Sequence, residues 1–352
     1  MGGIFKRHHI VPAKYRLDGY DDTYDFHTLA YDVIWMERQK ALLFVCPKLL
    51  NLADVFKTAI ITASGQKLKK PRIKQYRRHD EVWLDCKTRP TEVTLEARNL
   101  SISVNVSEQA HEFDGKNVLI TKSKNKALVW IADWVAHHTT QQSANAALVF
   151  DNGSTDYALS DVQQTLQSFD ALDVAVAIAS DFPFGSWKAT KLLHRSMFYQ
   201  AGMLSLARHR FLHSARAVLA TDIDELVCGE DVFDAAVQSR LGYVKIPGFW
   251  RYSKLPEGQM PLHGDHVWRR DPDATCKEKY CLTPGRWFTE TVWDIHGLHR
   301  YAFNGLLKLK NTRILHCEHV YNGWKHRRGT EQDAPLVLEK QSKADLEYLR
   351  TK

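Results

Sequence analysis

An apolar run that ends in closely spaced carboxylates is the sequence feature that most constrains this chain. Residues 217–220 have the length and composition of a buried strand, and Thr221 leads from them into Asp222, Asp224 and Glu225. The carboxyl end of such a strand opens into the crevice where open α/β sheets bind ligands. Two neighbouring carboxylates repel each other, and a divalent cation such as Mg²⁺ or Mn²⁺ relieves that repulsion. The pattern predicts a metal site at a sheet edge, and a solvated turn is the ordinary alternative.

A second polar turn lies upstream. The apolar residues 147–150 read as a strand, and Asp151-Asn152-Gly153-Ser154-Thr155-Asp156 follows them with good helix-capping residues. Before that strand, residues 128–135 carry apolar side chains at helical spacing. The order strand, helix, strand, polar turn, helix, strand, D-x-D is far more specific than either motif alone.

Together these segments resemble glycosyltransferases of the GT-A fold, of the family 2 and family 92 type. Those families share a Lys-Asn pair, an acidic-Trp pair with a following His, an Asp-Asn-x-Ser-x-Asp turn and a D-x-D-E strand end. The resemblance covers about residues 116–322. One position departs from it, because the acid that follows Lys-Asn in those families is Lys126 here. The matching residues are Lys124, Asn125, Asp133, Trp134, His138, Phe150, the turn 151–156 and the motif 222–225.

The resemblance implies a metal-dependent transfer of a sugar from a nucleotide-sugar donor to a glycan or lipid-linked saccharide. Asp222 and Asp224 would hold Mn²⁺ or Mg²⁺, and a histidine would complete the metal shell. His319 aligns best with the family position because Val320-Tyr321 follows it, and His316 is the alternative. The implied donor-binding residues are Asn125, Asp151, Asn152, Asp156 and Asp222.

An inverting transfer also needs a carboxylate that removes the acceptor proton. The sequence does not fix this base. Glu290 and Asp294 are the first candidates because they lie in an aromatic-rich segment after the D-x-D motif, and Asp265 is the next. Pyranose rings stack on aromatic faces, although aromatic side chains are equally ordinary core material.

The predicted fold has three parts. Short segments with alternating apolar residues, near 41–45, 81–84 and 92–95, predict a small mainly-β domain over residues 1–115. Alternating strands and helices then predict an α/β GT-A domain over 116–330, with a Rossmann-like mixed sheet and helices on both faces. Residues 188–210 read as one long helix within it, and 331–352 as a C-terminal helix.

Composition bears on partners and location. The net charge of +7 suits an anionic substrate, and no basic-aromatic module of the kind that reads nucleic acid is present. The basic stretch 67–78 is interpreted as a solvated loop or, alternatively, as a contact for anionic lipid or polysaccharide. No apolar segment is long enough to span a membrane, so a cytoplasmic protein is expected, docking peripherally if its acceptor is lipid-linked.

Six cysteines without a C-x-x-C pair indicate a reducing compartment rather than a disulfide scaffold. Three other interpretations stay open. Cys276, Cys281, His316 and His319 offer zinc-binding side chains without a diagnostic spacing. A phosphatase of the haloacid-dehalogenase type also places D-x-D after a strand, but there the motif opens the domain and Thr or Gly-Thr follows it. A non-catalytic carbohydrate-binding protein on a transferase fold is the third, and Lys126 favours it.

Overall fold

The computed structural model describes residues 5–97, 100–190, 196–256, 258–299, 307–320 and 334–350. The chain forms two compact units. Unit 1 combines Met1–His111 with Asp181–His213, and unit 2 combines Glu112–Ser180 with Ser214–Lys352. The sequence did not suggest that residues 181–213 belong with the N-terminal segment. The predicted domain limits at 115 and 330 stay a prediction.

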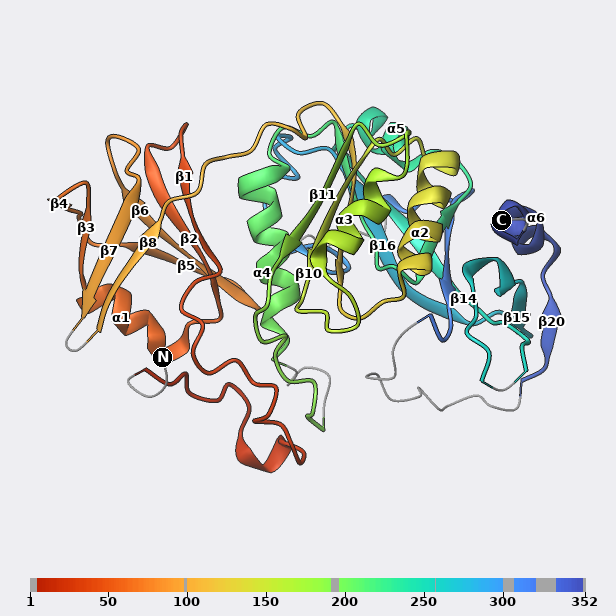
Figure 1. Cartoon of the computed structure of the whole chain (residues 1–352), viewed down its shortest axis with the longest axis horizontal. Helices are drawn as coiled ribbons and strands as arrows, with labels where there is room; N and C mark the ends of the chain where they lie inside the picture. Colours follow the sequence, from red (N-terminus) through yellow and green to blue (C-terminus); the bar gives the residue numbers. More distant parts are fainter. Residues whose placement is uncertain are drawn as a thin grey trace. The chain divides into compact units, whose positions relative to one another are not determined.

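Unit 1 contains two four-stranded antiparallel sheets, drawn in red to orange in Figure 1. Their facing side chains share one apolar core, to which Phe44, Phe56 and Leu95 contribute. Strand β7 alternates exposed and buried residues, which is the pattern of a sheet with one face on the core. The first sheet has the order β1 (Asp32–Met36), β2 (Ala41–Pro47), β6 (His79–Asp85), β5 (Arg72–Gln75), and the second has the order β4 (Gln66–Lys67), β3 (Ile60–Ala63), β7 (Glu92–Ala97), β8 (Leu100–Asn105).

The basic stretch 67–78 is therefore partly an edge strand rather than a loop. Arg72 pairs with Asp85 at 2.9 Å, and Lys74 lies 4.8 Å from the centre of the Trp83 ring. A lysine-rich edge also discourages pairing with other chains. Contact with an anionic surface stays a prediction. The short helices of this region are η1 (Ala13–Tyr15), η2 (Leu50–Leu52) and α1 (Ala53–Thr58).

The expected helix over 188–210 does not include residues 188–190, 196 and 197, and residues 191–195 lie outside the described part of the chain. Helix α4 spans Phe198–Leu206 and continues as a π-helix, η4, over Ala207–Phe211. The amide of Ser196 donates to the carbonyl of Ser186, so the backbone closes a loop here instead of a helical turn. Phe198 then packs against Tyr24, with ring centres 5.9 Å apart. Tertiary packing has overridden the helical pattern of the basic residues.

Unit 2 is a mixed α/β structure built on one eight-stranded sheet (Figure 1). Four neighbouring strands, β11 to β12 in the sheet order, run parallel, and β16 pairs antiparallel with β12 and β14. The sheet order is β11 (Val174–Ala179), β10 (Ala146–Asp151), β9 (Asn117–Ser123), β12 (Ala217–Ala220), β16 (Thr275–Leu282), β14 (Tyr243–Arg251), β19 (Arg313–Cys317), β13 (Glu225–Cys228).

Helices pack on this sheet and contribute side chains to the apolar core of unit 2. Helix α2 (Leu128–Gln141) packs beside α3 (Leu159–Gln167), while α5 (Val232–Gln238) packs on β12, β14 and β16. Trp134 of α2 is fully buried among Leu119, Val149 and Leu219 of the parallel strands. The remaining elements are η5 (His263–Asp265) and the small pairs β15 (Trp268–Arg270) with β20 (Leu336–Leu338) and β17 (Trp293–Asp294) with β18 (Gly297–Leu298).

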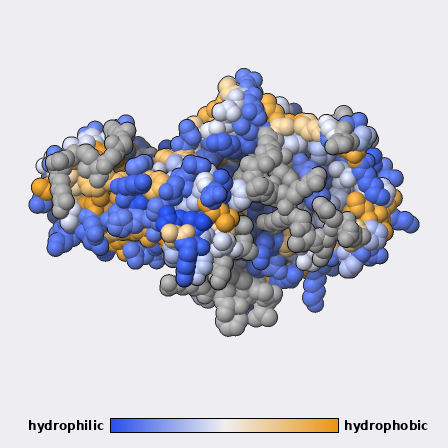
Figure 2. Space-filling model, turned by 90° about the horizontal axis from the view of Figure 1, so that it is seen from below, coloured by the Kyte–Doolittle hydropathy of each residue, from blue (hydrophilic) through white to orange (hydrophobic). Residues whose placement is uncertain are grey.

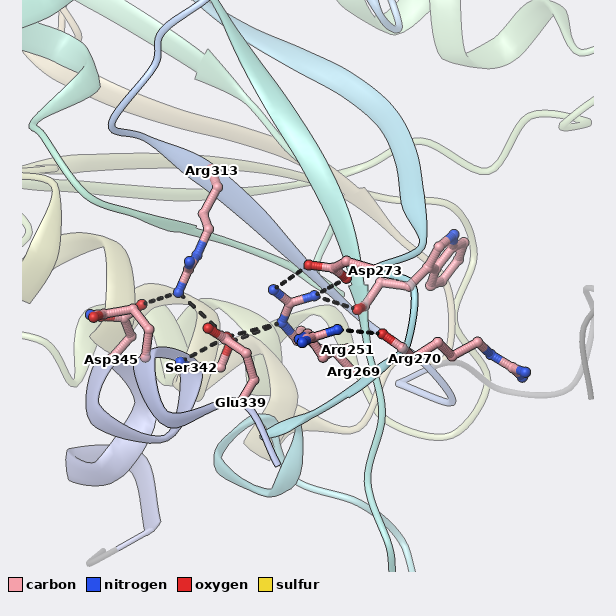
Figure 3. A network of polar contacts seen from close by, with 10 residues as sticks. Arg251, Arg269, Arg270, Asp273, Arg313, Glu339, Ser342 and Asp345 are labelled. Carbon is pink, nitrogen blue, oxygen red and sulfur yellow. Dashed lines mark hydrogen bonds and ion pairs between the residues drawn. The ribbon is translucent and has the colours of Figure 1, made fainter. Parts of the chain in front are cut away.

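A buried arginine ties the C-terminal helix to the sheet. Helix α6 covers Lys340–Arg350, so the helical part of the expected 331–352 segment begins after β20. Figure 3 shows the guanidinium of Arg251, at the end of β14, between Asp273 and Ser342. It donates to Asp273 Oδ1 at 2.9 Å and to Ser342 Oγ at 2.8 Å. Arg313 of β19 donates to Asp345 of α6 at 3.0 Å. The bidentate pair with Asp273 orients the guanidinium of Arg251, and the bonds from Arg251 to Ser342 and from Arg313 to Asp345 hold α6 against the sheet.

No described helix combines the length and apolar character that crossing a membrane requires. In Figure 2, hydrophilic residues cover most of the coloured surface and hydrophobic ones gather in smaller patches. Trp287 is the most exposed of the large apolar side chains described, at 71%. Other rings of the aromatic-rich segment, such as Tyr280 and Trp293, are buried, so packing accounts for them. Peripheral membrane contact stays a prediction.

Candidate functional site

The polar motifs meet at one edge of the unit 2 sheet. Strands β9, β10 and β12 are parallel neighbours, with Ile120 opposite Ala220 and Ser123 opposite Asp151. Carboxyl ends of parallel strands share one edge, so the turns after all three strands lie together. The sequence prediction that these turns form one site is consistent with this register.

Asn125 joins two of these turns. Its backbone is left-handed, with φ of 51°, a conformation that asparagine tolerates better than most residues. Its side-chain oxygen accepts from the amide of Thr155 at 2.6 Å and from that of Asp156 at 3.3 Å. Its own amide donates to Ser154 Oγ at 2.8 Å. Asn125 therefore shapes the edge of the site from within the protein.

Asp151 and Asn152 are also buried and hydrogen-bonded. Asp151 Oδ2 accepts from the amide of Ser154 at 3.0 Å, which closes the turn after β10. Asn152 Nδ2 donates to the carbonyl of Ser180 at 2.9 Å, and its backbone amide donates to the carbonyl of Ser123 at 2.8 Å. These bonds show how the turn is held, and the donor-binding role of both residues stays a prediction.

Two lysines hold Asp222. Lys122, at the end of β9, donates to Asp222 Oδ1, and Lys279 of β16 donates to Asp222 Oδ2 at 2.7 Å. Lys279 also lies 3.1 Å from Glu225 Oε2, and that oxygen accepts from the amide of Asp222 at 2.9 Å. Burial alone would lower the pKa of Lys279, but the charges of Asp222 and Glu225 raise it above its ordinary value. The side chain of Lys279 is 2% exposed, so this ammonium is a permanent buried charge.

Asp224 has a different pair of cationic neighbours. Lys126 Nζ lies 3.7 Å from Asp224 Oδ2, and His316 Nε2 lies 3.6 Å from the same oxygen. Burial would lower the pKa of His316, but the charge of Asp224 and a hydrogen bond with it raise that pKa to about 10. Burial raises the pKa of Glu225, with Asp222 and Asp224 acting in the same direction and Lys279 opposing them.

Side chains of α2 and η5 form hydrogen bonds with the D-x-D turn and the residue before it. Trp134 Nε1 of α2 donates to Thr221 Oγ1 at 3.2 Å. His263 Nε2 donates to the carbonyl of Ile223, the middle residue of the motif, at 2.8 Å, and its Nδ1 lies 3.4 Å from Asp133. The Asp133-Trp134 pair picked out in the sequence therefore supports the D-x-D turn through these contacts.

The structure places His316 beside the D-x-D motif. His316 lies in β19 directly opposite Glu225 of β13, and its ring stacks on Trp250 with centres 4.0 Å apart. His319 follows the strand with a φ of 68° and lies 3.5 Å from Glu318. The preference for His319 came from the following Val-Tyr pair, and the strand register brings the earlier histidine to Asp224. Tyr321 lies outside the described residues.

The three candidate bases come from different local structures, Asp265 from η5, Asp294 from β17 and Glu290 from the segment between β16 and β17. Asp294 Oδ1 accepts from the amide of Ile295 at 2.8 Å, and Asp265 Oδ2 accepts from the amide of Leu262 at 3.0 Å. Glu290 is exposed. Nothing in these contacts selects one of them, so the base stays a prediction.

A divalent cation between Asp222 and Asp224 does not fit this arrangement of charges. Its ligands would be the oxygens that already face Lys122, Lys279, Lys126 and His316. Two unit charges of like sign 4 Å apart repel by about 4 kcal/mol at an effective dielectric constant of about 20, and a divalent ion doubles that for each neighbour. The metal expected from the resemblance would have to displace these side chains.

Two cluster residues were missed in the sequence. Lys122 stands two positions before the Lys-Asn pair, and β9 carries it to a point level with Asp222. Lys279 arrives from β16, 57 residues after Asp222. For Lys122, a charged residue near the end of an apolar strand was the available signal. For Lys279 there was none, because its position depends on the antiparallel pairing of β16.

The alternative zinc set is not assembled. Cys281 is buried in the apolar core of unit 2, and among the described residues the four side chains of this set do not gather closely enough to form a group of three or more metal ligands. All six cysteines are free thiols.

Comparisons with known proteins add little to this geometry. Neither a protein-family model nor a curated protein matches the chain. Among solved structures, the mannosyltransferase PcManGT from Pyrobaculum calidifontis, in complex with GDP-Man and Mn²⁺, is similar with a TM-score of 0.34 and 18% identity. The match covers 62% of this chain and spans 59% of the length of that one. A likeness this distant supports no conclusion about this chain.

Proposed function

We propose that this chain is a glycosyltransferase that uses a nucleotide-sugar donor. One observation carries the proposal: the turns after β9, β10 and β12, which hold the Lys-Asn, Asp-Asn-Gly-Ser-Thr-Asp and Asp-Ile-Asp-Glu segments, lie at one sheet edge. The GT-A arrangement, with its donor crevice at this edge, is the fold that the motifs imply. Asn125, Asp151 and Asp156 would line the nucleoside side, and Asp222 the diphosphate side.

The reaction would be an inverting transfer to a glycan or lipid-linked saccharide. The acceptor hydroxyl oxygen forms a bond to the anomeric carbon while the bond from that carbon to the diphosphate oxygen breaks. The hydroxyl proton passes to a carboxylate, for which Glu290, Asp294 and Asp265 are the candidates, and the nucleoside diphosphate leaves with the electron pair. Cationic groups beside the leaving diphosphate stabilise its developing charge. The resemblance implies Mn²⁺ or Mg²⁺ as the source of that charge, whereas in this chain carboxylate oxygens of Asp222 and Asp224 face Lys122, Lys279, Lys126 and His316.

A thermal-shift panel of UDP-, GDP-, CDP-, ADP- and dTDP-sugars, each with Mn²⁺ and with EDTA, tests the proposal. Selective binding to the native state raises the midpoint of unfolding. We expect one nucleotide class to raise it, and we expect Asp222→Asn to reduce that effect. If no sugar nucleotide shifts the midpoint in either condition, the glycosyltransferase proposal is wrong.

A non-catalytic carbohydrate-binding protein is the second candidate. The observation that favours it is the engagement of Asp222 and Asp224 by lysines and a histidine of the same chain. Such a protein would bind a saccharide and release no nucleoside diphosphate from any sugar nucleotide. An assay for nucleoside diphosphate released from the donor that binds separates the two.

A further inference from the structure

Three lysines lie close to the carboxylates of the D-x-D motif. Lys122 comes from the end of β9, Lys126 from the loop after it and Lys279 from β16. All three approach carboxylate oxygens of the motif, with Lys126 at 3.7 Å from Asp224 and Lys279 at 2.7 Å from Asp222. Three ammonium groups thus balance Asp222, Asp224 and Glu225 before His316 is counted.

We infer that Lys122, held by Asp222, and Lys126, held by the carbonyl oxygen of Val320 beside Asp224, bind the diphosphate of the nucleotide directly, so that no divalent cation is needed. The inference rests on the proposed function and specifies how its donor is held. The carboxylates are positioning residues in this scheme, because they orient ammonium groups instead of ligating a metal.

The three lysines differ in the exposed fraction of their side chains, and this difference indicates which of them a ligand can reach. Lys279 is buried beneath Asp222 and Glu225, where it neutralises both. Lys122 and Lys126 keep 19% and 11% of their side chains exposed, and Asp222 beside them keeps 25%. A ligand can therefore approach Lys122 and Lys126 but not Lys279.

An ammonium group can serve two anions at once. It carries three N–H donors, so a lysine that gives one to a carboxylate can give another to a phosphate oxygen. Lysine binds phosphate as a point charge, and charge-assisted hydrogen bonds of this kind are among the strong ones. A bound Mn²⁺ would instead need the carboxylate oxygens that the lysines face.

The test is calorimetric titration of the full chain with UDP, GDP, CDP, ADP and dTDP, each in EDTA and in Mn²⁺. We expect one of them to bind in EDTA, with a dissociation constant within about twofold of that in Mn²⁺. Lys122→Gln should weaken that binding about tenfold or more, since loss of a hydrogen bond to a charged group has effects of this order. Lys126→Gln is the second variant, and the unfolding midpoint of each establishes that it is folded.

Lys116→Gln is the matched control. Lys116 precedes the same strand, β9, at its other end and pairs with Asp173 at 2.8 Å. Its loss removes one lysine and one ion pair from unit 2 away from the cluster. We expect nucleotide binding by this variant to equal that of the unchanged chain. Equal weakening by Lys116→Gln and Lys122→Gln would overturn the inference.

Titration with Mn²⁺ alone, followed by the electron paramagnetic resonance signal of the free ion, completes the test. We expect the double variant Asp222→Asn with Asp224→Asn to bind as much Mn²⁺ as the unchanged chain does. Mn²⁺ binding that this double variant abolishes, or nucleotide binding seen in Mn²⁺ but not in EDTA, overturns the inference while leaving the glycosyltransferase proposal standing. Absence of nucleotide binding in both conditions overturns the two together.

Discussion

Each unit buries one glutamate to the same degree, with a side chain that is 2% exposed, yet the two carboxylates are held differently. In unit 1, Glu81 accepts from Trp83 Nε1 at 3.0 Å, from Ser205 Oγ at 3.1 Å and from His209 Nε2 at 3.0 Å. In unit 2, Glu225 shares Lys279 with Asp222 and lies near Asp224 as well.

The pKa shifts of the two groups point in opposite directions. Burial alone would raise the pKa of Glu81, but the charge and hydrogen bond of His209 lower it well below its ordinary value. Burial raises the pKa of Glu225, and its carboxylate neighbours add to the shift. Donors around a carboxylate favour its charged form and lower its pKa, whereas burial beside other carboxylates raises it.

The largest expected effect on stability is that of a truncated chain that begins at Gly115. The cut removes β6 with Glu81 and leaves Ser205 and His209 without their acceptor. It also uncovers the buried faces of α4, including Phe198, which packs against Val11 and Tyr24. We expect this chain to show no cooperative unfolding transition in urea. A two-state transition with native-like stability would contradict the assignment of residues 181–213 to unit 1.

Lys279→Met tests the unit 2 side of the comparison. It removes the buried cation that Asp222 and Glu225 share, and breaking a buried ion pair from one side costs about 3–5 kcal/mol. We expect a loss of unfolding free energy of this size in urea denaturation. Lys116→Met, which breaks a more exposed pair, serves as the control and should cost less than about 1 kcal/mol. If Lys279→Met lowers the unfolding free energy by less than about 1 kcal/mol, Asp222 and Glu225 do not need this buried cation.

Glu81→Gln tests the unit 1 side. The amide keeps the shape but loses the charge that His209 complements, which should cost about 2 kcal/mol. Because the folded pKa of Glu81 is lowered, its stabilisation is complete above the unfolded pKa of about 4.3 and is lost as the pH falls towards the folded value.

The difference in unfolding free energy between the unchanged chain and Glu81→Gln should therefore be constant from about pH 7 to about pH 5 and shrink below about pH 4. Glu37→Gln is the exposed control, since Glu37 lies at the surface beside Lys40 and its substitution should change stability far less than Glu81→Gln does. A difference that grows on acidification would refute the assigned direction of the shift.

The smallest expected effect separates the two histidines near the D-x-D motif. His316→Ala removes a ring stacked on Trp250 and a neighbour of Asp224, and we expect a loss of about 1–2 kcal/mol. His319→Ala removes a half-exposed side chain and should cost less than about 0.5 kcal/mol. Urea denaturation of both variants at pH 7 measures the order, and the reverse order would return His319 to the cluster.

Local patterns were a sound guide to much of unit 2. Apolar runs bounded by polar turns located β10 and β12, because buried parallel strands are short and nearly uniformly apolar. The same reasoning placed the start of the helix over 188–210 too early, because α4 begins only at Phe198, which packs against Tyr24. The pattern also could not tell which of His316 and His319 faces Asp224, since that depends on pairing with β13.

The sequence by itself determined that three polar turns follow apolar strands and that two aspartates stand at the third strand end, because strand length and turn chemistry are local properties. Tertiary structure alone decided what surrounds those aspartates. Lys279 and His316 reach them through the sheet pairings of β16 and β19, across separations that no local pattern encodes. The charge of a site is a sum over neighbours in space, so the same motif can face a metal ion in one chain and lysines in another.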